Sequence, residues 1–181
     1  YPHYENSFEL GVIHNNRAAA YITISLFGDT IRADYNPFSG IEPDSLLNMA
    51  ESEVNRAISL YEGWVEKYGA SRREEIRGLI DAEFKRKMPA QEPAMMDKYL
   101  EARTEEIIRA RDETDRRLSV CYTNLGVIKR QRGEYEQAVR CYEKALGLWD
   151  RNLSAENNMN VLLGKPLKKR NIIQKMFPPE K

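Results

Sequence analysis

The stretch Tyr-Thr-Asn-Leu-Gly at residues 122–126 is followed by Gly-Glu-Tyr-Glu-Gln-Ala at residues 133–138, and then by Tyr142 and Ala145. A glycine ends the first segment, an alanine ends the second, and a further glycine punctuates the turn between them. Small residues let two helices approach closely, while the aromatic and apolar side chains around them fill the seam. The pattern therefore predicts an antiparallel helical hairpin.

An aromatic residue, a Leu-Gly pair, an alanine and a second aromatic at these spacings resemble the tetratricopeptide repeat, a helix–turn–helix unit. The match covers residues 119–152 and departs from the family pattern at two places. Lys129 stands where the family has a second aromatic on the first helix, and Asp150 stands where it commonly has a proline. The resemblance implies a fold of helical hairpins and a module that binds proteins without catalysing a reaction.

A degenerate copy of the pattern is predicted near the N-terminus, because one repeat cannot bury its own apolar face. Residues 10–13 repeat the Leu-Gly-Val-Ile of residues 125–128 at a shift of 115 positions, and the same shift aligns Phe27 with Tyr142. The copy would extend over residues 4–36.

A further echo lies within residues 54–65. Ala57, Ile58 and Tyr61 overlay the alanine, valine and tyrosine of residues 138–142 at a shift of 81 positions. Only the second helix of a unit is visible there.

The segment after the repeat is predicted to close the array with capping helices over residues 153–177. Residues 154–164 carry apolar residues where the first helix of a further unit would have them. Pro166 then favours a helix start, with apolar residues on one side and Lys and Arg around the other. Such a helix either covers the last unit or, as basic amphipathic helices do, contacts a membrane or a partner groove.

Apolar periodicity and breaker residues predict helices along most of the chain. Their expected ranges are 4–16, 18–34, 43–68, 72–87 and 94–132. The first two would form a hairpin, although a run of β-branched residues in the second has strand propensity. Residues 43–118 would be a long-helix insertion ahead of the repeat.

Within the longest helix, apolar residues recur at heptad-like spacing through a strongly charged stretch. These residues are Met96, Leu100, Ile107, Thr114, Leu118 and Cys121. Such a stripe must be covered, either by helices 43–68 and 72–87 of the same chain or by a second copy of the protein. The first alternative favours a monomer, and the second leaves self-association through residues 96–121 open.

Length and composition suit a single all-α domain over residues 1–181. Charged residues make up 31% of the chain and hydrophobic residues 41%, the balance of helices with long solvated faces. The formal net charge of zero removes the general attraction that nucleic-acid binding needs. No run reaches the roughly 18 apolar residues of a membrane span. We therefore expect a soluble protein that binds no nucleic acid.

Catalytic and metal-binding patterns are sparse. His3 and His14 lack the companion residues of a metalloenzyme helix, and no glycine-rich phosphate loop follows a strand. The carboxylates of the charged stretch lie among arginines, where ion pairs on a solvated face are expected. We therefore predict that the protein is not an enzyme and holds no cofactor and no metal.

The sequence leaves two properties open, namely the cellular compartment and the state of the two cysteines. The chain begins with Tyr1 and not with methionine, as a processed or trimmed product would. The protein would then be either cytoplasmic or exported with its signal removed. Cys121 and Cys141 fall on the paired helices of the hairpin, where a disulfide and two buried thiols are both compatible with the sequence.

The resemblance also implies a binding surface, because the first helices of tetratricopeptide repeats line a concave groove. The inward residues on the matched first helix and on the predicted cap are Thr123, Asn124, Val127, Arg130, Gln131, Asn157, Asn158 and Val161. Amide side chains there could hold an extended peptide backbone, and an arginine could bind a carboxylate. Thr123 and Val127 occupy two positions where the chaperone-tail binders of the family need clamp residues, so that specialised function is not expected.

The function predicted is thus a non-enzymatic scaffold that binds a protein or peptide on its concave helical face. A different class stays open. The helices could instead enclose an apolar pocket, lined by residues such as Tyr61, Trp64 and Phe84, in a small-ligand carrier or a transport accessory protein.

Overall fold

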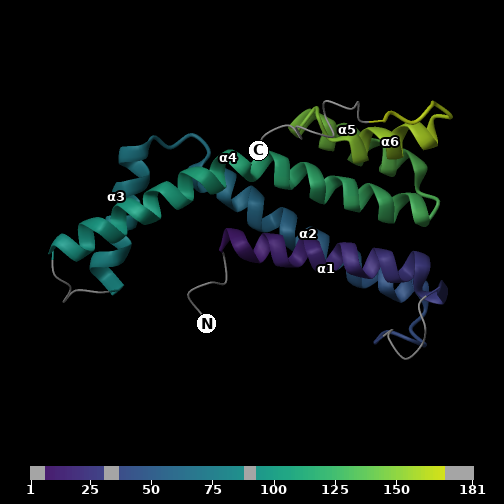
Figure 1. Ribbon diagram of the computed structural model, residues 1–181, viewed down its shortest axis with the longest axis horizontal. Helices are drawn as coiled ribbons and strands as arrows, with labels where there is room; N and C mark the ends of the chain where they lie inside the picture. Colours follow the sequence, from purple (N-terminus) through teal and green to yellow (C-terminus); the bar gives the residue numbers. More distant parts are fainter. Residues whose placement is uncertain (1–6, 31–36, 88–92, 170–181) are drawn as a thin grey trace.

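The computed structural model describes residues 7–30, 37–87 and 93–169, and these form helices without any strand. The elements are α1 (Phe8–Phe27), the 3-10 helix η2 (Gly28–Thr30), α2 (Pro43–Tyr68), α3 (Arg73–Lys87), α4 (Pro93–Gln131), α5 (Tyr135–Leu148) and α6 (Leu153–Leu162). The prediction of an all-α fold built from helical hairpins is confirmed (Figure 1).

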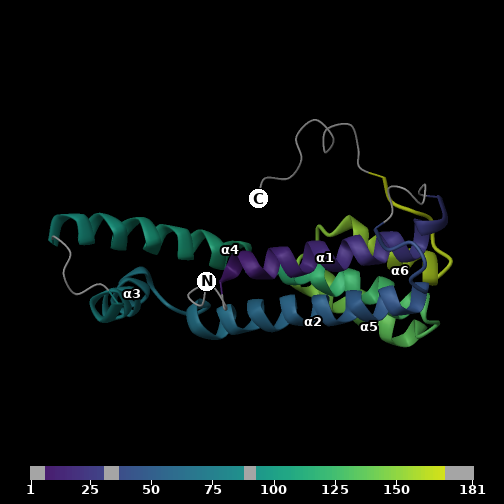
Figure 2. The same cartoon turned by 90° about the horizontal axis from the view of Figure 1, so that it is seen from below.

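Two antiparallel helix pairs make up the body of the molecule. Helix α1 lies along α2, α4 lies along α5, and α6 packs beside α5 (Figures 1 and 2). The contact between α2 and α4 joins the two pairs. One large cluster of buried apolar side chains runs through both pairs, so the pairs share a core.

Helix α2 has the predicted bounds of 43–68. Proline is favoured at the first helical position because its missing N–H needs no partner there, and Pro43 begins the helix with Asp44 in the first turn. Apolar residues are buried along the whole helix, from Leu46 to Tyr68, whereas Val65 is exposed.

Helix α4 is one continuous helix of 39 residues, as predicted, and is about 58 Å long at 1.5 Å per residue. Its heptad-like stripe is buried within the chain at Leu100, Ile107, Thr114 and Cys121. Helices α2 and α3 both pack on α4. The prediction that helices 43–68 and 72–87 cover the stripe is therefore confirmed.

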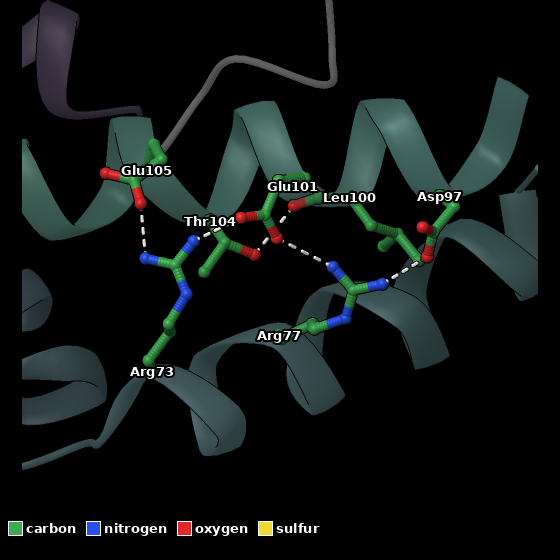
Figure 3. A network of polar contacts seen from close by, with 7 residues as sticks. All are labelled: Arg73, Arg77, Asp97, Leu100, Glu101, Thr104 and Glu105. Carbon is green, nitrogen blue, oxygen red and sulfur yellow. Dashed lines mark hydrogen bonds and ion pairs between the residues drawn. The ribbon is translucent and has the colours of Figure 1, made fainter.

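The first half of α4 and α3 together form an arm that projects from the body (Figures 1 and 2). Ile76 and Ile80 of α3 are buried in it. Arg73 bonds to Glu101 and Glu105, and the two Nη atoms of Arg77 bond to Asp97 and Glu101 (Figure 3). Arginine side chains therefore fix the register of α3 on α4 along the edge of the apolar contact.

The predicted hairpin of residues 4–16 and 18–34 is wrong within the described residues, because α1 is a single helix. Ser7 caps it by accepting a hydrogen bond from the Leu10 N–H at 3.3 Å. No breaker interrupts the helix at residues 15–18, and the β-branched run stays helical because Tyr21 and Ile22 are buried in a contact with α2 and α4. Tertiary packing outweighs local strand propensity here.

The predicted capping helices are confirmed only in part. Helix α6 closes the array at residues 153–162, but residues 165–169 are not helical, so Pro166 does not begin a helix. Gly164 has a φ of +64° and reverses the chain, a conformation that favours glycine after a helix. Residues 170–177 lie outside the described residues.

Candidate functional site

The predicted seam of the hairpin exists between α4 and α5. A Cβ atom on Gly126 would lie 2.4 Å from Cε1 of Tyr142, so only glycine lets the ring pack on the helix. Ala138, Tyr142 and Ala145 are fully buried. Burial also raises the pKa of the Tyr142 hydroxyl to about 12. The packing inferred from these residue types is confirmed.

Helices α1 and α2 repeat the same relationship. A Cβ atom on Gly11 would lie 2.7 Å from Cζ of Tyr61, and the Tyr61 ring is buried. The shift of 115 positions aligned Phe27, and not Tyr61, with Tyr142. Phe27 is instead 56% exposed at the end of α1. The two separate echoes in the sequence, at residues 10–13 and 57–61, therefore belong to one hairpin. Its second helix is α2, whose residues were predicted to belong to the insertion.

A polar side-chain pair occupies matching positions in the two hairpins. His14 Nδ1 lies 2.5 Å from Glu53 Oε2, and Lys129 Nζ lies 3.1 Å from Glu134 Oε2. His14 and Lys129 are 115 positions apart, and the two glutamates are 81 positions apart, the same shifts that relate the glycines and the tyrosines. Lys129 also bonds to Glu51 of α2 at 2.9 Å. It thus replaces the family's second aromatic residue with an ionic contact to the preceding hairpin.

The first helices α1, α4 and α6 are joined by hydrogen bonds at matching positions. Asn124 Nδ2 donates to Asn15 Oδ1 at 2.9 Å, which ties α4 to α1. Arg130 Nη1 donates to Asn158 Oδ1 at 2.9 Å, which ties α4 to α6. Asn15 corresponds to Arg130 at the shift of 115, and Asn124 corresponds to Asn158 at a shift of 34. The polar residues of the three helices therefore lie in one register. We call the face of α1, α4 and α6 that carries Asn15, Asn124, Arg130 and Asn158 the first-helix surface.

The structure separates the predicted site residues into three groups. Thr123 is only 5% exposed and belongs to the interior, so its assignment to the surface is wrong. Asn124, Val127 and Arg130 are half-buried, and the two polar ones make the bonds between helices. Asn157 and Asn158 on α6 are also half-buried, whereas Gln131 and Val161 are exposed.

Asn152 explains why Thr123 is buried, a role that was not predicted from the sequence. Its Oδ1 accepts from the Ala155 N–H at 3.1 Å and so caps α6. Its Nδ2 donates to Ser119 Oγ at 2.8 Å and to Thr123 Oγ1 at 2.9 Å. A buried hydroxyl costs little when it is bonded in this way. An asparagine immediately before the first apolar residue of a helix is an N-cap signal that could have indicated it.

An open pocket of about 390 Å³ lies on α6. Its lining residues are Leu153, Ser154, Asn157, Asn158, Val161 and Leu167. Three of them are predicted site residues, and Arg130 reaches the pocket edge through its bond to Asn158. The pocket therefore brings together the part of the predicted site that lies on the cap.

Two findings on the described residues concern metal binding and thiol chemistry. No group of three or more His, Cys, Asp or Glu side chains in them could hold a metal ion. Cys121 and Cys141 are both free thiols, and burial raises the pKa of Cys121 to about 12. Among these residues no helix is long and apolar enough to cross a membrane.

The carrier alternative depended on Tyr61, Trp64 and Phe84 sharing a pocket. The ring of Phe8 packs edge-on against Tyr61 at 5.1 Å and against Trp64 at 5.4 Å between ring centroids. Both rings are thus core residues, while Phe84 lies on α3 in the arm.

Comparison with known proteins agrees with this geometry. The family model of the tetratricopeptide repeat matches residues 119–152, which comprise the end of α4, all of α5 and the turn between them. No curated protein and no solved structure matches the chain. The seam of Gly126 and Tyr142 lies inside the matched residues. The chain therefore carries a tetratricopeptide repeat at residues 119–152.

Proposed function

We propose that the protein is a non-enzymatic interaction scaffold that binds an extended segment of a partner protein on its first-helix surface. The observation that carries this proposal is the register of Asn15, Asn124 and Asn158 on three neighbouring helices, fixed by the two bonds described above. An amide side chain offers two N–H donors and two acceptor lone pairs. Amides spaced across a surface can therefore bind successive peptide groups of a partner.

The composition of the surface suits a protein partner. Amides, one arginine and the exposed Val161 offer hydrogen bonds and an apolar contact without a strong field of one sign. The formal net charge of zero supports this choice over nucleic acid, because phosphate binding requires a basic excess. The tetratricopeptide repeat supports protein binding as the general role.

Partner capture with two matched double variants tests the proposal. The surface variant combines Gln131→Asp on α4 with Val161→Asp on α6. The control combines Gln137→Asp on α5 with Val65→Asp on α2, and all four positions are exposed. Exposed substitutions change stability by less than about 0.5 kcal/mol, so both variants should melt like the wild type.

The full chain is used to capture a partner from cells of the source organism, and the purified partner is then titrated with each variant. The surface variant should lose at least about tenfold in affinity, equivalent to about 1.4 kcal/mol, while the control binds like the wild type. Loss of binding in the control alone would place the partner on the second helices and contradict the proposal.

A further inference from the structure

The chain that follows α6 runs back along the same helix. The Lys165 N–H donates to the Asn160 carbonyl at 2.8 Å, which closes the turn at Gly164. Asn160 Nδ2 then donates to the Pro166 carbonyl at 3.3 Å. These bonds direct residues 165–169, which we call the tail segment, along α6, where Leu167 forms one wall of the pocket. We call the α6 surface along which the tail segment runs the α6 groove; it comprises Glu156, Asn157, Asn160 and the pocket residues Leu153 and Val161.

The side-chain amide of Asn157 bonds to the backbone of the tail segment through both its nitrogen and its oxygen. Its Nδ2 donates to the Lys168 carbonyl at 2.9 Å, and its Oδ1 accepts from the Lys168 N–H at 2.8 Å. Such a pair recognises any residue in an extended conformation, because it uses only main-chain groups. Asn157 is one of the residues predicted from sequence to hold a peptide backbone.

Two side chains of the tail segment add selectivity. Leu167 lines the pocket beside Leu153 and Val161. Lys168 Nζ lies 2.5 Å from Glu156 Oε1. The α6 groove thus accepts an apolar residue followed by a basic one.

The two side chains of the tail segment stay largely open to solvent. Leu167 remains 57% exposed, and the Lys168 side chain remains 64% exposed. Exposed ion pairs contribute little and are screened by salt. Another segment with the same chemistry could therefore replace the tail segment.

We propose that the α6 groove binds an extended segment of a partner protein in which an apolar residue precedes Lys or Arg, and that the tail segment is a built-in competitor for this groove. This inference rests on the proposed function and specifies both its ligand and its regulation. A competitor in the same chain lowers the apparent affinity for a partner by the fraction of molecules in which the groove is open.

The test uses the full chain, a capped peptide with the sequence of residues 164–169, and NMR of the Asn157 side-chain amide. In a Leu167→Gly/Lys168→Gly variant the Asn157 signals should shift, because the tail segment no longer occupies the groove. Adding the peptide to this variant should return the signals to their wild-type positions. Titration should extend to about 5 mM, because a tethered segment competes at millimolar effective concentration.

Affinity for the peptide should be lower in the wild type than in the tail variant. If the tail segment is seated nine-tenths of the time, the apparent Kd should be about tenfold higher. A matched control, Lys165→Gly/Lys169→Gly, changes tail residues that make none of the proposed side-chain contacts and should behave like the wild type. A peptide with glycine in place of its leucine and of the lysine that follows it should cause no shift.

Three results would overturn the inference. The first is an Asn157 signal that is the same in the wild type and in the tail variant. The second is a folded tail variant that does not respond to the peptide, and the third is an equal response in wild type and variant. None of these results depends on partner capture by the Gln131→Asp/Val161→Asp variant, so the scaffold proposal and the tail inference can fail separately.

Discussion

The ring of Tyr142 lies directly on Gly126, so close that a Cβ atom on the glycine would stand 2.4 Å from the ring. Tyr61 lies on Gly11 in the same way, at 2.7 Å. The two contacts define the seams of two hairpins, of which the second carries the tetratricopeptide repeat. The arrangement of α1, α4 and α6, and hence the first-helix surface, depends on these seams.

The first prediction concerns the glycines. Alanine is normally favoured over glycine inside a helix by about 1 kcal/mol. Gly126→Ala and Gly11→Ala should nevertheless destabilise the protein by about 1–3 kcal/mol each, because the new methyl group overpacks a buried tyrosine. Gly63→Ala on α2 is the matched control, since a Cβ atom there meets nothing within 4 Å.

Urea denaturation of the three variants measures these changes. Gly63→Ala should be neutral or stabilising. Equal effects at all three positions would show that the seams are not closely packed.

A second prediction concerns pH and the contact between hairpins. Glu51 of α2 accepts hydrogen bonds from Lys129 and Arg132. Burial acts to raise the pKa of Glu51, but these two bonds outweigh it and leave the pKa below the ordinary value of 4.5. A carboxylate with a lowered pKa in the folded state stabilises the fold above its unfolded pKa. That stabilisation disappears as pH falls through the folded pKa.

The wild type should therefore exceed Glu51→Gln in unfolding free energy at neutral pH, and the difference should shrink below about pH 4.5. Urea melts between about pH 3 and pH 7 measure it, with Glu66→Gln at an exposed position of α2 as the control. A difference that does not change with pH would contradict the ionic role of Glu51.

The sequence predicted those elements whose signals are local. Pro43 begins α2, a glycine ends it, and the Gly126 and Ala138 pattern identifies the repeat. The pairing of Gly11 with Tyr61 was hidden because the two residues of the first hairpin are 50 positions apart, whereas Gly126 and Tyr142 are 16 apart. No single fixed shift can relate both.

Two features of the candidate site depended on tertiary partners. Thr123 is buried because Asn152, from the turn before α6, bonds its hydroxyl. Pro166 suits both a helix start and an extended segment, and the bonds of Asn157 to Lys168 select the extended form. Neither partner is adjacent in the sequence to the residue that it fixes.

A third prediction concerns the cysteines. The thiolate is the reactive form of cysteine, and burial raises the pKa of Cys121 to about 12 and also raises the pKa of the half-buried Cys141. With iodoacetamide at about pH 8, Cys121 should be alkylated only after unfolding. Peptide mass spectrometry over time would measure both sites. Equal rates at Cys121 and Cys141 in the folded protein would contradict the burial of Cys121.

The arm yields a fourth prediction. Because α2 and α3 cover the stripe of α4, a second copy is not needed for its burial. Light scattering over a wide concentration range should give a monomer of 21.0 kDa. Ile107→Ala should cost about 2–5 kcal/mol, since it leaves a cavity at a buried site, without changing the mass. A dimer at all concentrations would show that a second copy takes part in the fold.

Site-specific photo-crosslinking shows which helices contact a bound protein partner. A photoreactive amino acid is placed at Gln131 on α4 or, in a separate protein, at Gln137 on α5, two exposed glutamines on a first and a second helix. Each protein is irradiated with the captured partner. A partner bound on the first-helix surface should crosslink to position 131 and not to position 137, whereas crosslinks from position 137 alone would place the partner on the second helices.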